Sequence, residues 1–281
     1  MGAENRRICW LASYPKSGNT WTRAFLRAYQ VDARSPINPN DIGKISRSES
    51  RRRYFGLVSG IEESSLDEAA IRSYRRDVQE LIAKEIGDFQ VAKTHNATVS
   101  PFGERLIFPE FTRCAVYLVR NPVDVVDSLA DHNGLSIKDA IKLMNDPGHQ
   151  IGGPGDPFVT QFLGTWSDHV RSWTQQDSFP VLIVRYEDLK QNAIAVFTQV
   201  LRFIGWPVDH QRIARANEYC SFEHLQEFEM RNGFGELSDR SVSGKFFREG
   251  RVGTGKKRLT SEQAEQINAH HEAVIQQLKY C

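Results

Sequence analysis

The chain has 281 residues, of which 40% are hydrophobic and 25% are charged. These values are ordinary for a globular protein and exclude a disordered or collagen-like chain. Because 36 Lys and Arg residues are balanced by 35 Asp and Glu residues, no overall field draws the protein to nucleic acid or to an acidic membrane. We therefore expect neither of these partners, and any anion site must be local.

No segment of the sequence is typical of a membrane or export signal. The longest apolar runs, 114–119 and 179–184, are about a third of the roughly 20 residues that a membrane-spanning helix needs. The first ten residues lack the apolar core of a signal peptide, and Arg6 stands where a myristoylation signal has Ser or Thr. We therefore expect a cytoplasmic protein.

The four cysteines, at 9, 114, 220 and 281, are scattered without a CxxC pair. This argues against a zinc site and against a disulfide framework. The eight histidines show no HExxH or comparable ligand spacing either. We therefore expect reduced thiols that act as small hydrophobic side chains, and no metal.

The predicted elements alternate between strands and helices along the chain. Four short apolar, β-branched segments predict strands, and three of them lead directly into a helical pattern. This order is typical of βαβ units, so we expect a single α/β domain over 1–281 with a central parallel β-sheet flanked by helices. Strands are expected at 8–12, 89–92, 115–119 and 181–185, and helices at 20–29, 66–86, 122–132, 160–175, 192–204 and 261–279.

Helix starts and loops carry their own signals. Pro122 suits the first turn of a helix, and Asn192 suits an N-terminal cap. Three stretches are rich in Gly, Pro, Ser or basic residues and show little periodicity. Because long loops inside a domain are usually functional or disordered, we expect mobile loops on the substrate side. They are expected at 34–60, 145–160 and 231–258.

The segment at 13–21, SYPKSGNTW, joins the first predicted strand to the first predicted helix. Such a turn directs backbone N–H groups and the positive end of the helix toward one point, where an anion binds well. Gly18 permits close approach of the backbone, and Lys16 adds a full positive charge. It is not a Walker A loop, because Lys16 precedes Gly18. Taken alone, the segment fits a capped helix start with an exposed lysine equally well.

A second basic feature follows the third predicted strand. Arg120 leaves the end of that strand, and Ser128 lies two turns into the next helix. Both side chains reach a ligand that lies over the start of this helix. In isolation, a salt bridge from Arg120 to Asp124 or Asp127 explains the arginine better.

These motifs resemble those of a known enzyme family. YPKSGNTW at 14–21 resembles the 5′-phosphosulfate-binding loop of sulfotransferases that use 3′-phosphoadenosine 5′-phosphosulfate (PAPS). VRNPVDVVDS at 119–128 resembles their 3′-phosphate-binding strand and helix, in which an Arg and a Ser eight positions later hold the phosphate. KTH at 93–95, YED at 186–188 and SFE at 221–223 resemble further motifs in the same order. The resemblance covers nearly the whole chain.

The resemblance implies a P-loop-like nucleotide-binding fold with His95 as the general base. Lys16 and Lys93 are implied to neutralise charge on the leaving oxygen, while Trp21 and Phe222 sandwich the adenine. The lysines, His95 and two donor-binding residues all follow predicted strands, and ligands of open α/β sheets bind at the carboxyl ends of the strands. The implied donor-binding residues are Lys16, Ser17, Gly18, Asn19, Thr20, Trp21, Arg120, Ser128, Tyr186, Phe222, Arg248 and Gly250.

The implied reaction moves a sulfuryl group from PAPS to a hydroxyl of a small-molecule acceptor and leaves 3′,5′-ADP. The ordinary pKa of histidine suits it to take the acceptor's proton. Lysines and amides neutralise the charge that Mg²⁺ neutralises in kinases, so the scheme needs no metal. We expect a phenol or an alcohol as acceptor, while a glycan or a peptide tyrosine stays open.

The chain departs from the family pattern near the C-terminus. RKGxxGDWK of the family reads REGRVGTGK at 248–256, so Glu249 replaces a Lys and opposes the 3′-phosphate if it points inward, with Arg251 as a compensating charge. Cys220 stands where relatives often carry a Thr beside the adenine. A homodimer is suggested by a short pattern that resembles the family's KxxxTVxxxE motif, although a helix cap at Thr260 explains it as well. Its residues are Lys256, Thr260 and Glu265.

Two other functions compete with this interpretation. A small-molecule P-loop kinase needs a carboxylate for Mg²⁺ and a true phosphate loop, and the position of Lys16 argues against it. A nucleotide-binding protein that has lost catalysis keeps the PAPS site but does not need His95.

Overall fold

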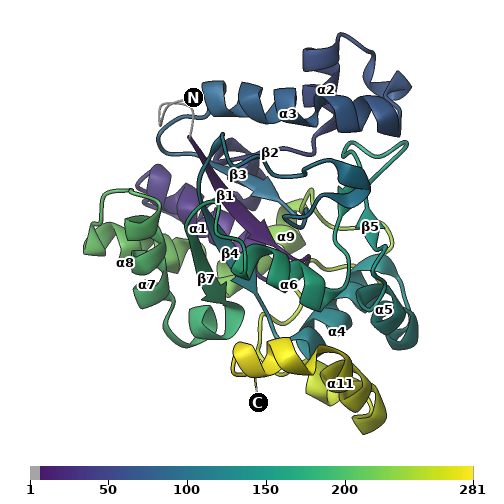
Figure 1. The fold of residues 1–281 in the computed structure, drawn as a ribbon. Coiled ribbons are helices and arrows are strands. Elements are labelled where there is room, and N and C mark those ends of the chain that lie inside the picture. The colour runs from purple at the N-terminus through teal and green to yellow at the C-terminus, as the bar shows by residue number, and fades with distance from the viewer. Residues whose placement is uncertain (1–6, 281) are drawn as a thin grey trace. The chain divides into compact units, whose positions relative to one another are not determined.

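A central β-sheet flanked by helices forms this α/β protein (Figure 1). The computed structural model describes residues 7–280, apart from the side chain at position 102, so Arg6 and Cys281 lie outside the described residues. The sheet has five strands in the order β2-β3-β1-β4-β7. They are β1 (Ile8–Ser13), β2 (Ser46–Ser48), β3 (Val91–Thr94), β4 (Thr112–Val119) and β7 (Val181–Arg185).

The four strands predicted from the sequence are present in the sheet. The strand predicted at 89–92 begins two residues later, because Phe89 is 41% exposed and burial starts at Val91. Strand β2 was not predicted, since Ser46-Arg47-Ser48 is short, polar and without apolar alternation. It pairs with β3 as the edge strand.

The register of β1, β2 and β3 brings their carboxyl ends to one edge. Both β1 and β2 run parallel to β3, with Ala12 opposite Thr94 and Ser48 opposite Lys93. The residues that follow these strands therefore leave the sheet together, as expected for a parallel arrangement. This places the segment after β3 beside the end of β1.

Two compact units divide the chain. The first holds residues 1–14, 46–117 and 146–183, and the second holds 15–45, 118–145 and 184–281. In the first unit α2 packs beside α3, and a small antiparallel sheet joins β5 to β6. The further elements of this unit are α2 (Arg52–Ser59), η3 (Glu63–Ser65), α3 (Glu68–Glu85), η4 (Pro101–Gly103), β5 (Gln150–Ile151), β6 (Gln161–Phe162) and α6 (Trp166–Thr174).

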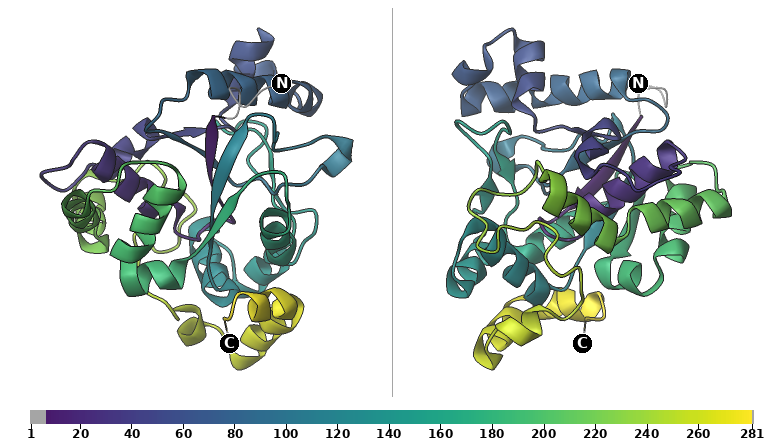
Figure 2. Two further views of the ribbon diagram at one scale, coloured as in Figure 1. Left: turned by 60° about the vertical axis from the view of Figure 1, so that its left-hand side comes forward. Right: turned by 180° about the vertical axis from the view of Figure 1, so that it is seen from behind.

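Helices dominate the second unit, where α8 packs against both α1 and α7 (Figure 2). The ring of Phe25 on α1 stacks on Phe197 of α7, with 3.8 Å between the centroids. The elements are α1 (Asn19–Gln30), η2 (Pro39–Lys44), α4 (Pro122–Asn133), α5 (Ile137–Met144), α7 (Tyr186–Phe203), α8 (His210–Tyr219), α9 (Phe222–Asn232), α10 (Gly255–Arg258) and α11 (Ser261–Gln277).

Several helix predictions are confirmed and one is wrong in part. Pro122 opens α4 as expected, and the Asn192 side chain accepts a hydrogen bond from the Ala195 N–H at a break within α7. The helix predicted at 160–175 starts only at Trp166, because residues before it pair in β6 and Thr165 caps the helix. The ranges interpreted as loops hold short elements, among them α2 and α10. Their mobility, and a single domain over 1–281, stay predictions.

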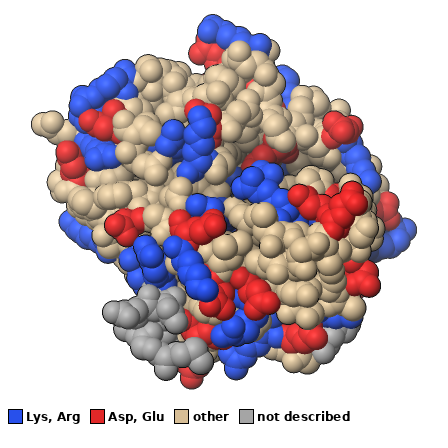
Figure 3. Space-filling view, turned by 90° about the horizontal axis from the view of Figure 1, so that it is seen from above, with Lys and Arg blue, Asp and Glu red and all other residues tan. Residues whose placement is uncertain are grey.

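The distribution of charged side chains on the surface and the hydropathy of the helices agree with what the composition predicts. On the face shown in Figure 3, Lys and Arg side chains alternate with Asp and Glu, without a large area of one sign. Within residues 7–280 no helix combines the length and the apolar character required to cross a membrane.

Candidate active site

The loop after β1 carries the first part of the site. Lys16 has φ +68° and Gly18 has φ +99°, the left-handed region that an L side chain rarely adopts. A Cβ on Gly18 would lie 2.8 Å from Cδ2 of Tyr186, so the backbone passes close to that ring. Gly18 also precedes α1, whose first N–H groups point to the loop. The loop therefore presents amide donors at a helix N-terminus.

Lys16 is a half-buried cation inside this loop. Its Nζ lies 4.1 Å from the centroid of the Phe246 ring. Burial lowers the pKa of Lys16 to about 8, although the carboxylates of Glu236 and Asp131 act in the opposite direction. An anion bound next to such a lysine stabilises its charged form.

Arg120 joins the loop to the strand that it follows. Its guanidinium donates to the carbonyl of Lys16 at 3.3 Å and to the carbonyl of Arg251 at 3.1 Å. It also lies 4.4 Å from the centroid of the Tyr186 ring and 3.7 Å from the Asp124 carboxylate. The salt bridge weighed in the sequence analysis is thus present, but Arg120 mainly contacts the predicted donor site.

Two buried polar atoms in this part of the site make no hydrogen bond with any described residue. Within the described chain, Oγ of Ser17 and Nε of Arg120 are buried without a hydrogen-bond partner. The side chains of Asn19 and Thr20, by contrast, bond to Arg23 and Glu236. A buried polar group without a partner costs free energy, so Ser17 and Arg120 fit a bound anion.

Arg248 lies beside α4 and makes two ion pairs. Its Nη2 is 2.6 Å from Oδ2 of Asp127, and its Nη1 is 3.8 Å from Asp131. Asp127 also contacts Arg258 at 3.4 Å, and Arg258 in turn pairs with Glu249 at 2.5 Å. Glu249, the departure from the family pattern, is therefore neutralised by Arg258 rather than by Arg251.

Gly250 and Phe222 are in direct contact. Gly250 has φ +58°, and a Cβ built on it would lie 2.2 Å from Cδ2 of Phe222, the first residue of α9. The Asp124 carboxylate accepts from the N–H groups of Gly253 and Gly255, each at 2.8 Å, and so fixes the following turn. Ser128 is half-buried on α4, next to Asp127.

The predicted adenine side is aromatic and basic. Trp21 contacts the Tyr186 ring edge to face, with 6.2 Å between the centroids. Nζ of Lys190, which the sequence analysis missed, lies 5.1 Å from the Trp21 ring centroid and 6.0 Å from that of Phe222. Burial lowers the pKa of Lys190 and raises that of Cys220 to about 12, which keeps this thiol protonated.

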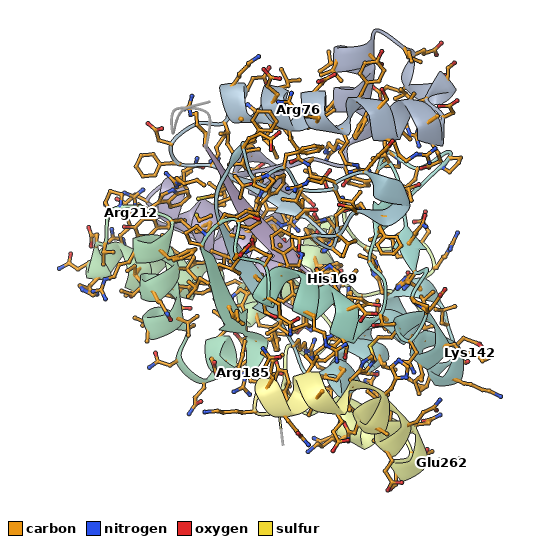
Figure 4. The ribbon with its side chains drawn as sticks, viewed as in Figure 1. Arg76, Lys142, His169, Arg185, Arg212 and Glu262 are labelled. Atoms are coloured by element: carbon orange, nitrogen blue, oxygen red, sulfur yellow. The ribbon has the colours of Figure 1, made fainter. Side chains whose placement is uncertain are left out.

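His95 is held by backbone and ring contacts after β3. Its Nδ1 lies 2.7 Å from the carbonyl oxygen of Ser13, which only accepts, so Nδ1 carries the proton. The N–H of His95 donates to Gln161, and its carbonyl accepts from Nε2 of His169 on α6 (Figure 4). In the neutral imidazole the lone pair is then on Nε2.

The site residues divide between the two units. Lys93, whose Nζ lies 5.8 Å from the centroid of the Phe158 ring, and His95 belong to the first unit. The twelve predicted donor-binding residues belong to the second, since they fall in 15–45, 118–145 and 184–281. Within that unit Lys16, Arg120 and Tyr186 are brought together, as are Phe222 and Gly250.

Sequence reasoning named Asp124 and Asp127 only as salt-bridge partners of Arg120 and missed that they organise the second unit's part of the site. Asp124 and Asp127 stand one helical turn apart on α4, and both are buried. That spacing places both carboxylates on one face of the helix, which was the available signal. Apart from Arg120, which pairs with Asp124, the basic and amide partners of these carboxylates lie more than 120 residues later, which no local pattern shows.

Two further expectations concern a metal ion and a homodimer. In the portion of the chain with described coordinates, no group of three or more His, Cys, Asp or Glu side chains is placed to hold a metal ion. Thr260 caps α11 in a capping box with Gln263. This supports the local explanation of the pattern at Lys256, Thr260 and Glu265, and a homodimer stays a prediction.

Comparison with known proteins agrees with this arrangement. A family model described as "Sulfotransferase domain" matches residues 6–279. Sulfotransferase 1A1 of Rattus norvegicus is 30% identical over 272 residues, which cover 93% of this chain and 82% of that protein. Sulfotransferase 1B1 of Mus musculus is 26% identical over 276 residues, which cover 92% and 79%.

Solved structures show the same fold. Retinol dehydratase in complex with androsterone and the inactive cofactor PAP is 17% identical, with a TM-score of 0.63 over 96% of this chain and 81% of that chain. Mouse sulfotransferase SULT7A1 complexed with PAP is 20% identical, with a TM-score of 0.59 over 96% and 84%. At these identities the likeness concerns the fold.

Proposed function

Because the chain belongs to the sulfotransferase domain family, we propose that it transfers a sulfuryl group from PAPS to a hydroxyl of a small molecule. Membership of the family makes the protein a sulfotransferase. The cluster of Lys16, Arg120 and Tyr186 supports PAPS as the donor. Beside it, buried polar atoms of Ser17 and Arg120 lack a hydrogen-bond partner within residues 7–280, and a bound anion would supply one. The two solved structures described above both contain PAP.

Donor binding is assigned to the second unit. PAPS supplies the activated sulfuryl group and a 3′-phosphate. Lys16, the Ser17 hydroxyl and the amides of the loop bind the 5′ side, while Arg120, Ser128, Arg248 and the Gly250 backbone bind the 3′-phosphate. Trp21, Tyr186 and Phe222 hold the adenine, and the N–H groups of Asn19 and Thr20 are the donors at the start of α1.

His95 acts as the general base in this proposal. With the proton of Nδ1 donated to the Ser13 carbonyl, Nε2 accepts the proton of the acceptor hydroxyl. The same carbonyl then stabilises the imidazolium that forms. Lys16 and Lys93 neutralise the negative charge that develops on the leaving oxygen of the 5′-phosphate.

The acceptor is a phenol or an alcohol in our proposal. Retinol dehydratase is in complex with androsterone, which supports a small-molecule acceptor for this fold. The ranges 34–60 and 145–160 are expected to shape the acceptor pocket, and a cytoplasmic location stays a prediction. Transfer assays with a simple phenol and a simple alcohol, each with PAPS, identify the class.

The test separates donor binding from catalysis. We expect 3′,5′-ADP to bind in the presence of a chelator and the Arg120→Ala variant to bind about 10 to 100 times more weakly, because a charged hydrogen-bond donor is lost. We expect His95→Ala to bind 3′,5′-ADP normally but to lose transfer by about 10² to 10⁴. Calorimetric titration and a transfer assay measure the two quantities.

Matched controls and a contrary result complete this test. Arg202→Ala and His270→Ala remove exposed side chains outside the site and leave both quantities unchanged. Preference for ATP with Mg²⁺ over 3′,5′-ADP points to a kinase instead. An undiminished transfer rate in His95→Ala rejects the general base.

A further inference from the structure

A carboxylate with no exposed surface lies beside the segment that carries His95. Glu49 follows the edge strand β2 and is 0% exposed. Its backbone N–H donates to the Lys93 carbonyl at 3.4 Å, so it continues the pairing of β2 with β3. The short polar strand thus serves to bring this carboxylate to the end of β3.

The carboxylate of Glu49 accepts from both neighbours of His95. Its Oε1 is 2.8 Å from the hydroxyl of Thr94 and 2.7 Å from Nδ2 of Asn96. The same oxygen accepts from Ser50 at 2.6 Å. Because the side chains on either side of His95 bond to the same oxygen atom, the backbone between them is held at two points.

Arg75 of α3 balances the charge of Glu49. Its Nη1 lies 3.1 Å from Oε2 of Glu49, and its Nη2 donates to the Thr160 carbonyl at 3.0 Å. Arg75 is 4% exposed, so the pair is screened little by solvent. The next residue, Gln161, accepts from the His95 N–H at 3.2 Å. The ion pair is therefore connected to the His95 segment twice. Glu49 binds the side chains on either side of His95, and Arg75 binds the residue before Gln161.

The surrounding contacts complete the support of this segment. Oδ1 of Asn96 accepts from the Phe162 N–H at 2.8 Å, and the Asn96 carbonyl accepts from Nε1 of Trp173 at 3.0 Å. The His95 carbonyl accepts from His169 at 3.0 Å. What the segment then presents is the His95 ring, directed by its 2.7 Å bond to the Ser13 carbonyl.

We infer that Glu49, neutralised by Arg75, is a positioning residue that holds the His95 imidazole in its Nδ1-protonated form against the Ser13 carbonyl. This rests on the proposed function only where it concerns transfer, because tautomer and pKa of His95 are measured without a substrate. Loss of the Glu49 contacts lets the ring leave the Ser13 carbonyl. The imidazolium then loses an acceptor, and the pKa of His95 falls.

The variants remove the contact at Glu49 or at its partner. Glu49→Gln removes the charge. Thr94→Val removes one donor to Glu49, together with the acceptor of the Asn96 N–H, without changing the shape of the side chain. Thr94→Ser keeps the hydroxyl and is the rescuing variant. Glu85→Gln is the matched control, because it removes an exposed glutamate that pairs with Arg47 of the same strand β2.

Nitrogen NMR of the histidine side chains is the first measurement. We expect the Nδ1–H tautomer in the wild type, Thr94→Ser and Glu85→Gln, and a mixture of tautomers with a lower His95 pKa in Thr94→Val and Glu49→Gln. An unchanged tautomer and pKa in Thr94→Val overturns the inference. This holds even if Glu49→Gln does not fold, because Thr94→Val keeps the ion pair.

Transfer kinetics are the second measurement. We expect kcat to fall about 10- to 100-fold in Thr94→Val and Glu49→Gln, since small displacements of a catalytic group cost about this much. KM and the affinity for 3′,5′-ADP stay within about twofold, and the acid limb of the pH profile moves to lower pH. A wild type that transfers nothing from PAPS rejects the proposed function, while the NMR result still decides the role of Glu49.

Discussion

Lys16 makes donor binding depend on pH at the scale of a single residue. Burial lowers the pKa of Lys16 to about 8, so the ligand-free protein loses this charge as the pH rises through that value. An anionic ligand favours the charged form, so binding raises the pKa and takes up a proton above pH 8. We expect the affinity for 3′,5′-ADP to fall by up to about tenfold per pH unit above this point.

Calorimetry in two buffers of different ionisation enthalpy measures the proton uptake directly. Lys16→Arg is the matched variant, because its guanidinium stays charged and its affinity is expected to be flat with pH. Lys142→Arg changes an exposed lysine of α5 and keeps the wild-type dependence. Wild-type affinity that does not change between about pH 7 and pH 9.5 contradicts this role of Lys16.

Two buried histidines give the elements around β1 and α6 a sensitivity to acid. His149 contacts the Tyr14 hydroxyl at 2.9 Å, and His169 contacts the Tyr117 hydroxyl at 2.9 Å. Burial lowers the pKa of each imidazole to about 4. The unfolded chain has its histidines near pKa 6.5, so it binds protons below that pH while the folded protein does not.

The free energy of unfolding therefore falls as the pH drops from about 6.5 to about 4, and each histidine contributes about 1.4 kcal/mol per pH unit. Urea denaturation at several pH values measures this slope. We expect His169→Gln to reduce the difference between pH 7 and pH 5, relative to the wild type at the same pH values. If the free energy of unfolding of the wild type is the same at pH 7 and pH 5, then His149 and His169 are not buried in the neutral form.

How far the sequence predicts these elements depends on the range of the contact. Strand β1, the loop at Lys16 and helix α4 follow from local patterns, and the structure has them where they were expected. Glu49 was not found, because its partners Arg75, Thr94 and Asn96 are 26 to 47 residues away and its strand lacks an apolar pattern. The thiols of Cys9 and Cys114, interpreted as scattered, lie 2.8 Å apart. This contact was not predicted either, because 105 residues separate the two cysteines in the sequence.

At the scale of the whole molecule, we expect donor binding to stabilise the unit that holds His95 as well. The chain passes between the two units five times, after residues 14, 45, 117, 145 and 183, and β4 and β7 each contain a point of passage. Neither unit is a continuous piece of chain, so we expect the two to unfold in one cooperative transition.

Ligand binding tests this coupling through hydrogen exchange. A ligand at 100 times its Kd stabilises the folded state by about 2.7 kcal/mol, which is about 100-fold in the population of the globally unfolded form. If unfolding is shared, 3′,5′-ADP slows exchange of the slowest amides of β1 and β3 by this factor, although its proposed ligands all lie in the second unit. Protection confined to 15–45, 118–145 and 184–281 would show instead that the units open independently, and His95 would then lie in a part of the fold that the donor does not stabilise.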